Sequence, residues 1–187
     1  MEVLEWAQFL EKSLLLKERK TSMTVGVFDG VHKGHQELIK RIVSYNAEFI
    51  PAAVTFRENH KTTIKGQEDI QSFEERLLIF EKLGIQLTIV IDFTEDFRKM
   101  SGIKFLEILL EHGNIGFFAV GSGFRCGCQL DTDAEAIKEF FASHGIAAEL
   151  VEEITEGSDL VSSSLIRAAI AAGDVKLAEK LLGHDWK

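Results

Sequence analysis

Two histidines three residues apart, His32 and His35, stand where an apolar run gives way to helical spacing in VGVFDGVHKGHQELIKRI, residues 25–42. The stretch predicts a strand, a glycine-rich turn and a helix. The first N–H groups of a helix have no intrahelical partner and lie at the positive end of its dipole, so they favour an anion. Each imidazole can donate a hydrogen bond, and a nearby phosphate would favour its charged form. Glycines in the turn let the main chain approach a ligand closely: Gly26, Gly30 and Gly34. The stretch therefore predicts a phosphate site.

Other interpretations of the two histidines remain open at this point. They are also compatible with surface positions or with a helix start that binds nothing. Two histidines without a third nearby Cys, His or carboxylate make a poor zinc site, so we expect no metal held by protein ligands. The stretch matches neither of two common nucleotide-binding patterns, GxGxxG and GxxxxGK[ST].

A second candidate anion site lies near the end of the chain, in SSSLIRAAIAAGDVKLAEKLLG, residues 162–183. Three serines stand at the start of a predicted helix, and Arg167 follows within its first turn. One serine is explained as an N-cap. Three hydroxyls together with a guanidinium, which can grip a phosphate with two hydrogen bonds, predict an anion pocket. The alternative is an ordinary cap followed by a solvated arginine.

The elements that position these residues alternate along the chain. We expect strands over 23–28, 49–56, 87–91, 117–121 and 147–151, and helices over 36–45, 72–83, 102–111, 132–143 and 162–182, the last broken at Gly173–Asp174. The first twenty residues predict an amphipathic helix. Strands that alternate with helices imply βαβ units and a parallel sheet, with ligands at the carboxyl ends of the strands. The histidine turn follows the first of these strands, so it falls at that edge.

Composition limits the class of protein. With 187 residues, of which 45% are hydrophobic, the chain can form one ordinary core. Its net charge of −9 argues against broad binding to nucleic acid, since that depends on Lys and Arg. The chain has no run of about 18 apolar residues, so we expect no membrane span. Cys126 and Cys128 are too close in sequence to staple a fold. We expect a cytoplasmic domain, and the oligomeric state stays open.

The two end motifs together resemble the bacterial FAD synthetase family, in its FMN adenylyltransferase module. The motifs are GVFDGVHKGH and SSSLIRAAIAAGDVKLAEKLLG. Four segments between them also fit the family in order: AVTF at 53–56, FEERLLIFEKLGI at 73–85, DFTEDFRKMSGIKFLEILL at 92–110, and VGSGFRCG at 120–127. The resemblance covers almost the whole chain after residue 22.

This resemblance implies an α/β fold with a Rossmann-like parallel sheet of the HxGH nucleotidyltransferase type. It implies transfer of AMP from ATP to FMN, with Mg²⁺, to give FAD and pyrophosphate. Its motifs give His32, His35 and Arg167 catalytic roles at the phosphates. The residues it implies for the nucleotide are Gly26, Val27, Phe28, Asp29, Gly30, Gly34, Gly121, Ser162 and Ser163. Those for the flavin are Phe56, Asn59, Phe124 and Arg125.

Two segments depart from the family's pattern. Its TFDPHP-like loop is TFRENH here, and its GxDFxFG segment is GSGFRCG, with Gly123 where an Asp is usual. A related nucleotidyltransferase with another phosphate acceptor, and a nucleotide- or flavin-binding protein without turnover, are therefore alternatives. The bifunctional members continue into a riboflavin kinase domain. We expect a single nucleotidyltransferase domain over 1–187, without that domain and without kinase activity.

Overall fold

The computed structural model describes residues 1–11, 18–58 and 68–186. Its centre is a six-stranded sheet in the order β1-β4-β3-β2-β5-β8, in which every neighbouring pair is parallel. The strands are β1 (Glu2–Glu5), β2 (Thr21–Val25), β3 (Ile50–Phe56), β4 (Leu87–Ile91), β5 (Ile115–Gly121) and β8 (Ala147–Val151). Apart from β1 at the edge, the strands have the order of a Rossmann-like sheet, so the predicted fold class is confirmed.

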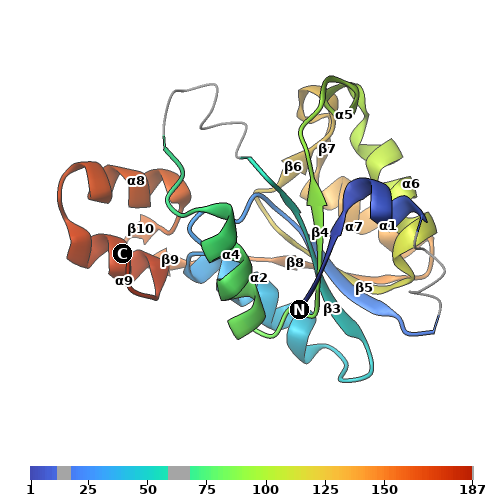
Figure 1. The fold of residues 1–187 in the computed structure, drawn as a ribbon, viewed down its shortest axis with the longest axis horizontal. Coiled ribbons are helices and arrows are strands. Elements are labelled where there is room, and N and C mark those ends of the chain that lie inside the picture. Colours follow the sequence, from blue (N-terminus) through green and yellow to red (C-terminus); the bar gives the residue numbers. More distant parts are fainter. Residues whose placement is uncertain (12–17, 59–67, 187) are drawn as a thin grey trace.

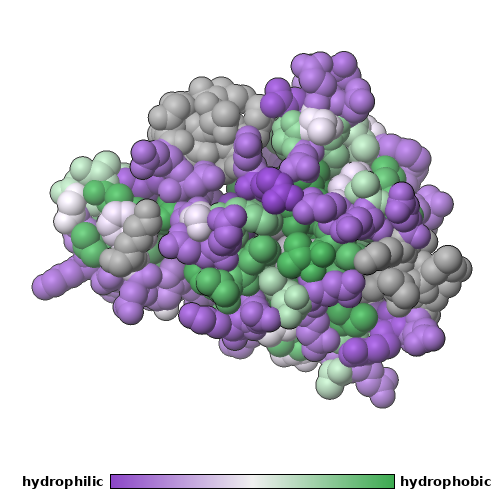
Figure 2. All heavy atoms as spheres, viewed as in Figure 1, coloured by the Kyte–Doolittle hydropathy of each residue, from purple (hydrophilic) through white to green (hydrophobic). Residues whose placement is uncertain are grey.

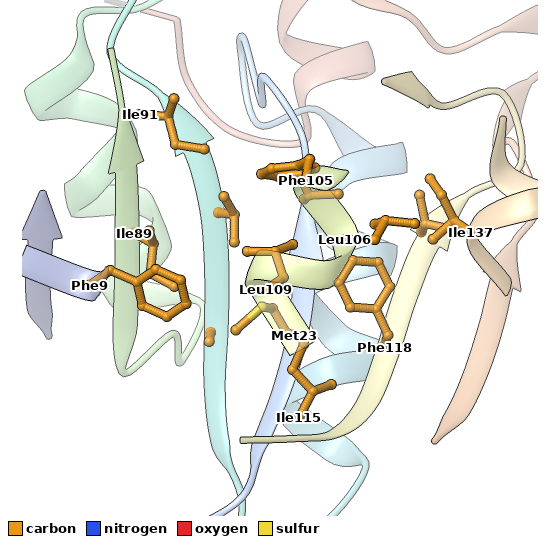
Figure 3. Close-up of a cluster of buried hydrophobic side chains, with 14 of the residues drawn as sticks. Phe9, Met23, Ile89, Ile91, Phe105, Leu106, Leu109, Ile115, Phe118 and Ile137 are labelled. Carbon is orange, nitrogen blue, oxygen red and sulfur yellow. The ribbon is translucent and has the colours of Figure 1, made fainter. Parts of the chain in front are cut away.

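Helices cover both faces of this sheet (Figure 1). One face carries α1 (Trp6–Glu11), α6 (Gly102–Gly113) and α7 (Ala134–Ser143), and the other carries α2 (Lys33–Ser44) and α4 (Phe73–Lys82). Side chains from α6, α7 and the strands form the larger core, in which Phe105, Leu109 and Phe118 are almost fully buried (Figure 3). The other core packs Ile39 and Phe80 against the opposite face of the sheet.

The last two helices, α8 (Ser163–Ala171) and α9 (Val175–Leu182), pack against each other at one end of the sheet (Figure 1). They share a small apolar cluster with Ile70 and Val161. The predicted break between them is confirmed: Gly173 has a φ of 74°, and the Asp174 side chain caps α9.

The remaining elements are short. They are α5 (Glu95–Lys99), the 3-10 turn η2 (Cys128–Leu130), a hairpin of β6 (Arg125–Cys126) and β7 (Thr132–Asp133), and a hairpin of β9 (Thr155–Glu156) and β10 (Asp159–Leu160). A capping box starts α4: Ser72 accepts from Glu75 N, and the Glu75 carboxylate accepts from Ser72 N.

Two sequence expectations were wrong. The first strand ends at Val25 rather than at 28, because Phe28 takes a left-handed conformation (φ 55°) and turns the chain out of the sheet. The first residues form strand β1 and not a helix. Leu4 is buried in the core, and the strand pairs in parallel with β4, so tertiary packing overrides the helical pattern. The helix there is α1, of six residues.

The surface in the view of Figure 1 is largely hydrophilic, with an apolar area over α4 and the strands beside it (Figure 2). Exposed Leu78 lies on α4 and exposed Val3 on β1. Within the described residues, no helix combines the length and the apolar character needed to cross a bilayer.

Candidate functional site

A cleft of about 700 Å³ opens at the carboxyl ends of β2 and β5. Within the sheet, β3 and β4 lie on one side of strand β2, and β5 and β8 lie on its other side. The order of strands thus reverses between β2 and β5, which is where such sheets bind ligands. The turn after β2, the start of α2 and the start of α8 all line this cleft.

The start of α2 has the features of an anion site. Its N-cap residue, His32, has extended backbone angles and makes no side-chain capping hydrogen bond. No side chain therefore competes from the cap position for the first N–H groups of α2. A Cβ at Gly34 would lie 3.3 Å from the His32 ring, so glycine leaves room for that ring. Gly30 does not line the cleft; with a φ of 84° it packs beside Leu182 of α9.

The two histidine rings lie against each other, with centroids 3.6 Å apart and planes 19° from parallel. The His35 ring also forms a T-shaped contact with the Phe28 ring, with centroids 5.2 Å apart. In both histidines Nδ1 is buried without a hydrogen-bond partner among the described residues. Burial lowers the pKa of His32 to about 4. Burial, with His32 and Arg76 nearby, puts the pKa of His35 well below its usual value. In this structure both rings are therefore neutral at pH 7, and each can donate one hydrogen bond and accept another.

Asp29 ties the histidine turn to two distant segments. Its carboxylate is 2% exposed, accepts from Ile70 N at 2.9 Å and forms an ion pair with Arg167. Its backbone oxygen accepts from the hydroxyl of Ser163 at 2.9 Å. Burial raises the pKa of Asp29, and the Arg167 guanidinium and the Ile70 N–H oppose that rise. Asp29 therefore fixes the start of α8 beside the turn.

The predicted second anion pocket lies at the cleft, but its side chains already have protein partners. Ser162 caps α8 by accepting from Leu165 N, so the capping alternative is confirmed for this serine. The Arg167 side chain is 18% exposed, and its Nε donates to the Glu68 oxygen at 3.3 Å. The picture of a solvated arginine is therefore wrong. A phosphate that reached Arg167 would share its guanidinium with Asp29.

Aromatic side chains form the opposite wall of the cleft. Phe56, at the end of β3, meets Phe93 at 5.5 Å and Phe97 at 5.9 Å between ring centroids. Phe124 and Arg125 also line the cleft, and the Arg125 Nε donates to the Leu130 oxygen. The other predicted residues in the lining are Gly26, Val27, Phe28 and Gly121. Predicted Asn59 lies outside the described residues.

Sequence reasoning missed several residues here. Phe93, Phe97 and Arg98 line the cleft, and the only signal was a pair of phenylalanines four residues apart in FTEDF. Arg76 of α4 is fully buried behind the turn. It donates to the Phe56 oxygen at 2.7 Å, while its Nε and Nη2 have no partner among the described residues. Nothing in a helical sequence pattern distinguishes a buried arginine from an exposed one.

Comparison with known proteins agrees with this geometry. Residues 15–165 match a family model described as FAD synthetase. The chain is 30% identical over 175 residues to FAD synthetase of Listeria monocytogenes, covering 90% of this chain and 70% of that protein. It is 27% identical to a bifunctional riboflavin kinase/FMN adenylyltransferase of Escherichia coli, covering 88% of this chain and 54% of that protein. The chain thus spans about half the length of such bifunctional relatives.

Solved structures show the same architecture. A Streptococcus pneumoniae crystal structure described as a macrolide-efflux protein superposes with a TM-score of 0.78 at 27% identity, over 89% of this chain and 56% of that one. A pantothenate synthetase from Thermus thermophilus superposes with a TM-score of 0.59 at 10% identity, over 97% of this chain and 71% of that one. The second likeness concerns the fold alone.

Proposed function

We propose that this chain, which belongs to the FAD synthetase family, transfers the AMP part of ATP to FMN and releases pyrophosphate. One observation carries this proposal beyond the family. The uncapped start of α2 and two histidines with buried Nδ1 atoms face the same cleft as an aromatic wall. The helix start and the histidines suit a triphosphate, and the aromatic wall suits a flavin ring.

The proposed reaction needs no activated nucleophile. A phosphate oxygen of FMN is already anionic near neutral pH and attacks the α-phosphorus of ATP. A P–O bond forms to FMN, and the bond from the α-phosphorus to the bridging oxygen of pyrophosphate breaks. The barrier lies in holding two polyanions in line and in stabilising charge on the leaving group. His32, His35 and the first N–H groups of α2 supply hydrogen-bond donors at that place.

The family implies Mg²⁺, and the described residues offer this ion no preformed cluster of His, Cys, Asp or Glu ligands. In the part of the chain that the structure describes, no group of three or more His, Cys, Asp or Glu could hold a metal ion. Mg²⁺ characteristically keeps several waters and binds the phosphates of its substrate. Phosphate oxygens of ATP and water would therefore be its main ligands, and the ion would supply positive charge at the phosphates.

The first changed residue of the TFRENH loop, Arg57, is compatible with FMN as the acceptor. Glu58 lines the cleft, and residues 59–60 lie outside the described residues. Arg57 does not line the cleft; it pairs with Glu5 at 2.6 Å and with Asp92 at 3.0 Å. Phe56, which the family shares, keeps its place in the aromatic wall. Arg57, the first residue that departs from the family's loop pattern, therefore leaves that wall intact.

The test is to incubate the purified protein with ATP, Mg²⁺ and FMN and to measure FAD and pyrophosphate, which we expect in equal amounts. Riboflavin in place of FMN is the control, since it has no phosphate and should give no FAD. Turnover of another phosphomonoester but not of FMN would instead identify a related nucleotidyltransferase. ATP binding without any turnover would identify a binding protein.

A further inference from the structure

The cleft contains a carboxylate that the proposed chemistry does not use. Glu153 lies two residues after β8 and lines the cleft together with Gly123, which lies in the turn after β5. The turn is fixed by a hydrogen bond from Phe124 N to the Gly121 oxygen at 2.9 Å. Ser122 N donates to the Val151 oxygen at 2.9 Å, which holds the ends of β5 and β8 side by side.

The side chain of Glu153 occupies the place of the side chain that Gly123 lacks. A Cβ at Gly123 would lie 2.7 Å from Oε1 of Glu153 and 3.6 Å from its Cδ. Gly123 is not among the residues with positive φ, so its backbone does not require glycine. A side chain at position 123 would instead displace the Glu153 carboxylate. This is also the position where the family's segment usually has Asp, so a carboxylate reaches the same place from the neighbouring strand.

The position of Glu153 restricts what it can recognise. Along the cleft, the aromatic side chains follow β3 and β4, the anion-binding turn follows β2, and Glu153 follows β8. A negative carboxylate repels phosphate and accepts hydrogen bonds from O–H or N–H donors. The part of ATP that continues from the phosphates and offers hydroxyl donors is the ribose. In dinucleotide-binding Rossmann folds an acidic residue likewise accepts a hydrogen bond from a ribose hydroxyl.

We propose that Glu153 is a specificity-determining residue whose carboxylate accepts hydrogen bonds from the ribose hydroxyls of ATP. The inference rests on the proposed function, because it takes ATP as the nucleotide. This role depends on Gly123, because any side chain at that position would move the Glu153 carboxylate.

The first experiment measures the affinity for ATP with Mg²⁺ by calorimetry, without FMN. Glu153→Ala should weaken binding about tenfold or more, the scale of a charge-assisted hydrogen bond. The wild type should prefer ATP to 2′-deoxy- or 3′-deoxy-ATP, and the variant should lose that preference. Glu149→Ala removes the same charge from β8 outside the cleft, where Glu149 pairs with Arg41, and should change affinity less than about twofold.

Two further variants test the coupling with Gly123. Gly123→Ala should weaken ATP binding to a similar degree at a nearly unchanged melting temperature, because the flexible Glu153 side chain can move aside. Adding Gly123→Ala to Glu153→Ala should cause no further loss, since the two changes act through one carboxylate. Gly123→Asp combined with Glu153→Ala should regain binding, because it returns a carboxylate to the same place.

The outcomes separate this inference from the proposed function. A wild type that binds ATP but makes no FAD would refute the proposed function, and the binding comparison would still decide the role of Glu153. If instead the wild type makes FAD and Glu153→Ala binds ATP and the deoxy analogues as the wild type does, the inference alone is overturned. Fully additive losses in the double variant would overturn it as well.

Discussion

At the scale of single residues, His32 and His35 are neutral donors with buried Nδ1 atoms beside an uncapped helix start. Their spacing in the sequence was enough to predict the turn that they share. It could not predict their burial, which follows from the stacking of the two rings and from the packing of His35 on Phe28. The sequence could not predict the role proposed for Glu153 either, because that role depends on Gly123, a neighbour thirty residues away in the sequence.

We expect His35→Ala to lower turnover roughly 10²- to 10³-fold, as does the loss of one donor that stabilises charge in a transition state. His144→Ala, at an exposed position after α7, is the matched control and should keep full turnover. Steady-state kinetics and a melting curve on both variants check this. Turnover of His35→Ala like that of the wild type would show that the turn is only structural.

Stability should fall as the pH falls below 6.5. His32 has a pKa of about 4 in the fold and 6.5 when unperturbed. Between these values the unfolded chain binds a proton that the folded chain excludes, which favours unfolding as the pH falls. From pH 7 to 5.5 the wild type should lose about 1 kcal/mol more than His32→Gln, as measured by urea unfolding. An equal loss in the two proteins would mean that His32 titrates normally in the fold.

At the scale of elements, one buried carboxylate joins the turn after β2 to α8. The sequence indicated that both motifs meet at the cleft, but it assigned Arg167 to phosphate. It could not show that Asp29, 138 residues away, pairs with this arginine, because ion-pair partners depend on tertiary structure. The ion pair therefore holds α8 against the turn electrostatically. The cluster around Ile166 and Leu182 adds apolar packing.

We expect Arg167→Met to lower the free energy of unfolding by about 2 to 4 kcal/mol, because it leaves Asp29 buried without its partner. The double variant with Asp29→Asn should lose clearly less than the sum of the single changes. Arg41→Met, which removes an exposed arginine of α2, should cost less than about 1 kcal/mol. Urea unfolding measures all four. Lost use of ATP at full stability would instead assign Arg167 to the phosphates alone.

The short helix α5 contributes to the aromatic wall, and Phe97 on it meets Phe56, Phe93 and Phe105. We expect Phe97→Ala to raise the KM for FMN about tenfold and to leave the KM for ATP within about twofold, since the ring belongs to the aromatic wall that the proposal assigns to the flavin. Phe140→Ala on α7, outside the cleft lining, controls for general loss of packing. Equal effects on both substrates would contradict an acceptor-specific wall.

At the scale of the whole molecule, the alternation of strands and helices was enough to predict the parallel sheet and the edge where the cleft lies. The five predicted strands are all present, and β2 ends early only because Phe28 is left-handed. The sixth strand, β1, was missed because its sequence has a helical pattern and its pairing partner lies more than eighty residues away. Local sequence carries little information about such a pairing.

The central claim is that this cleft moves an AMP group from ATP to FMN. ATP labelled at the α-phosphorus, supplied with Mg²⁺ and FMN, tests it most directly. We predict that the label appears in FAD, with one unlabelled pyrophosphate released for each FAD formed. Label that stays in ATP or leaves as free AMP while FMN is unchanged would contradict the claim.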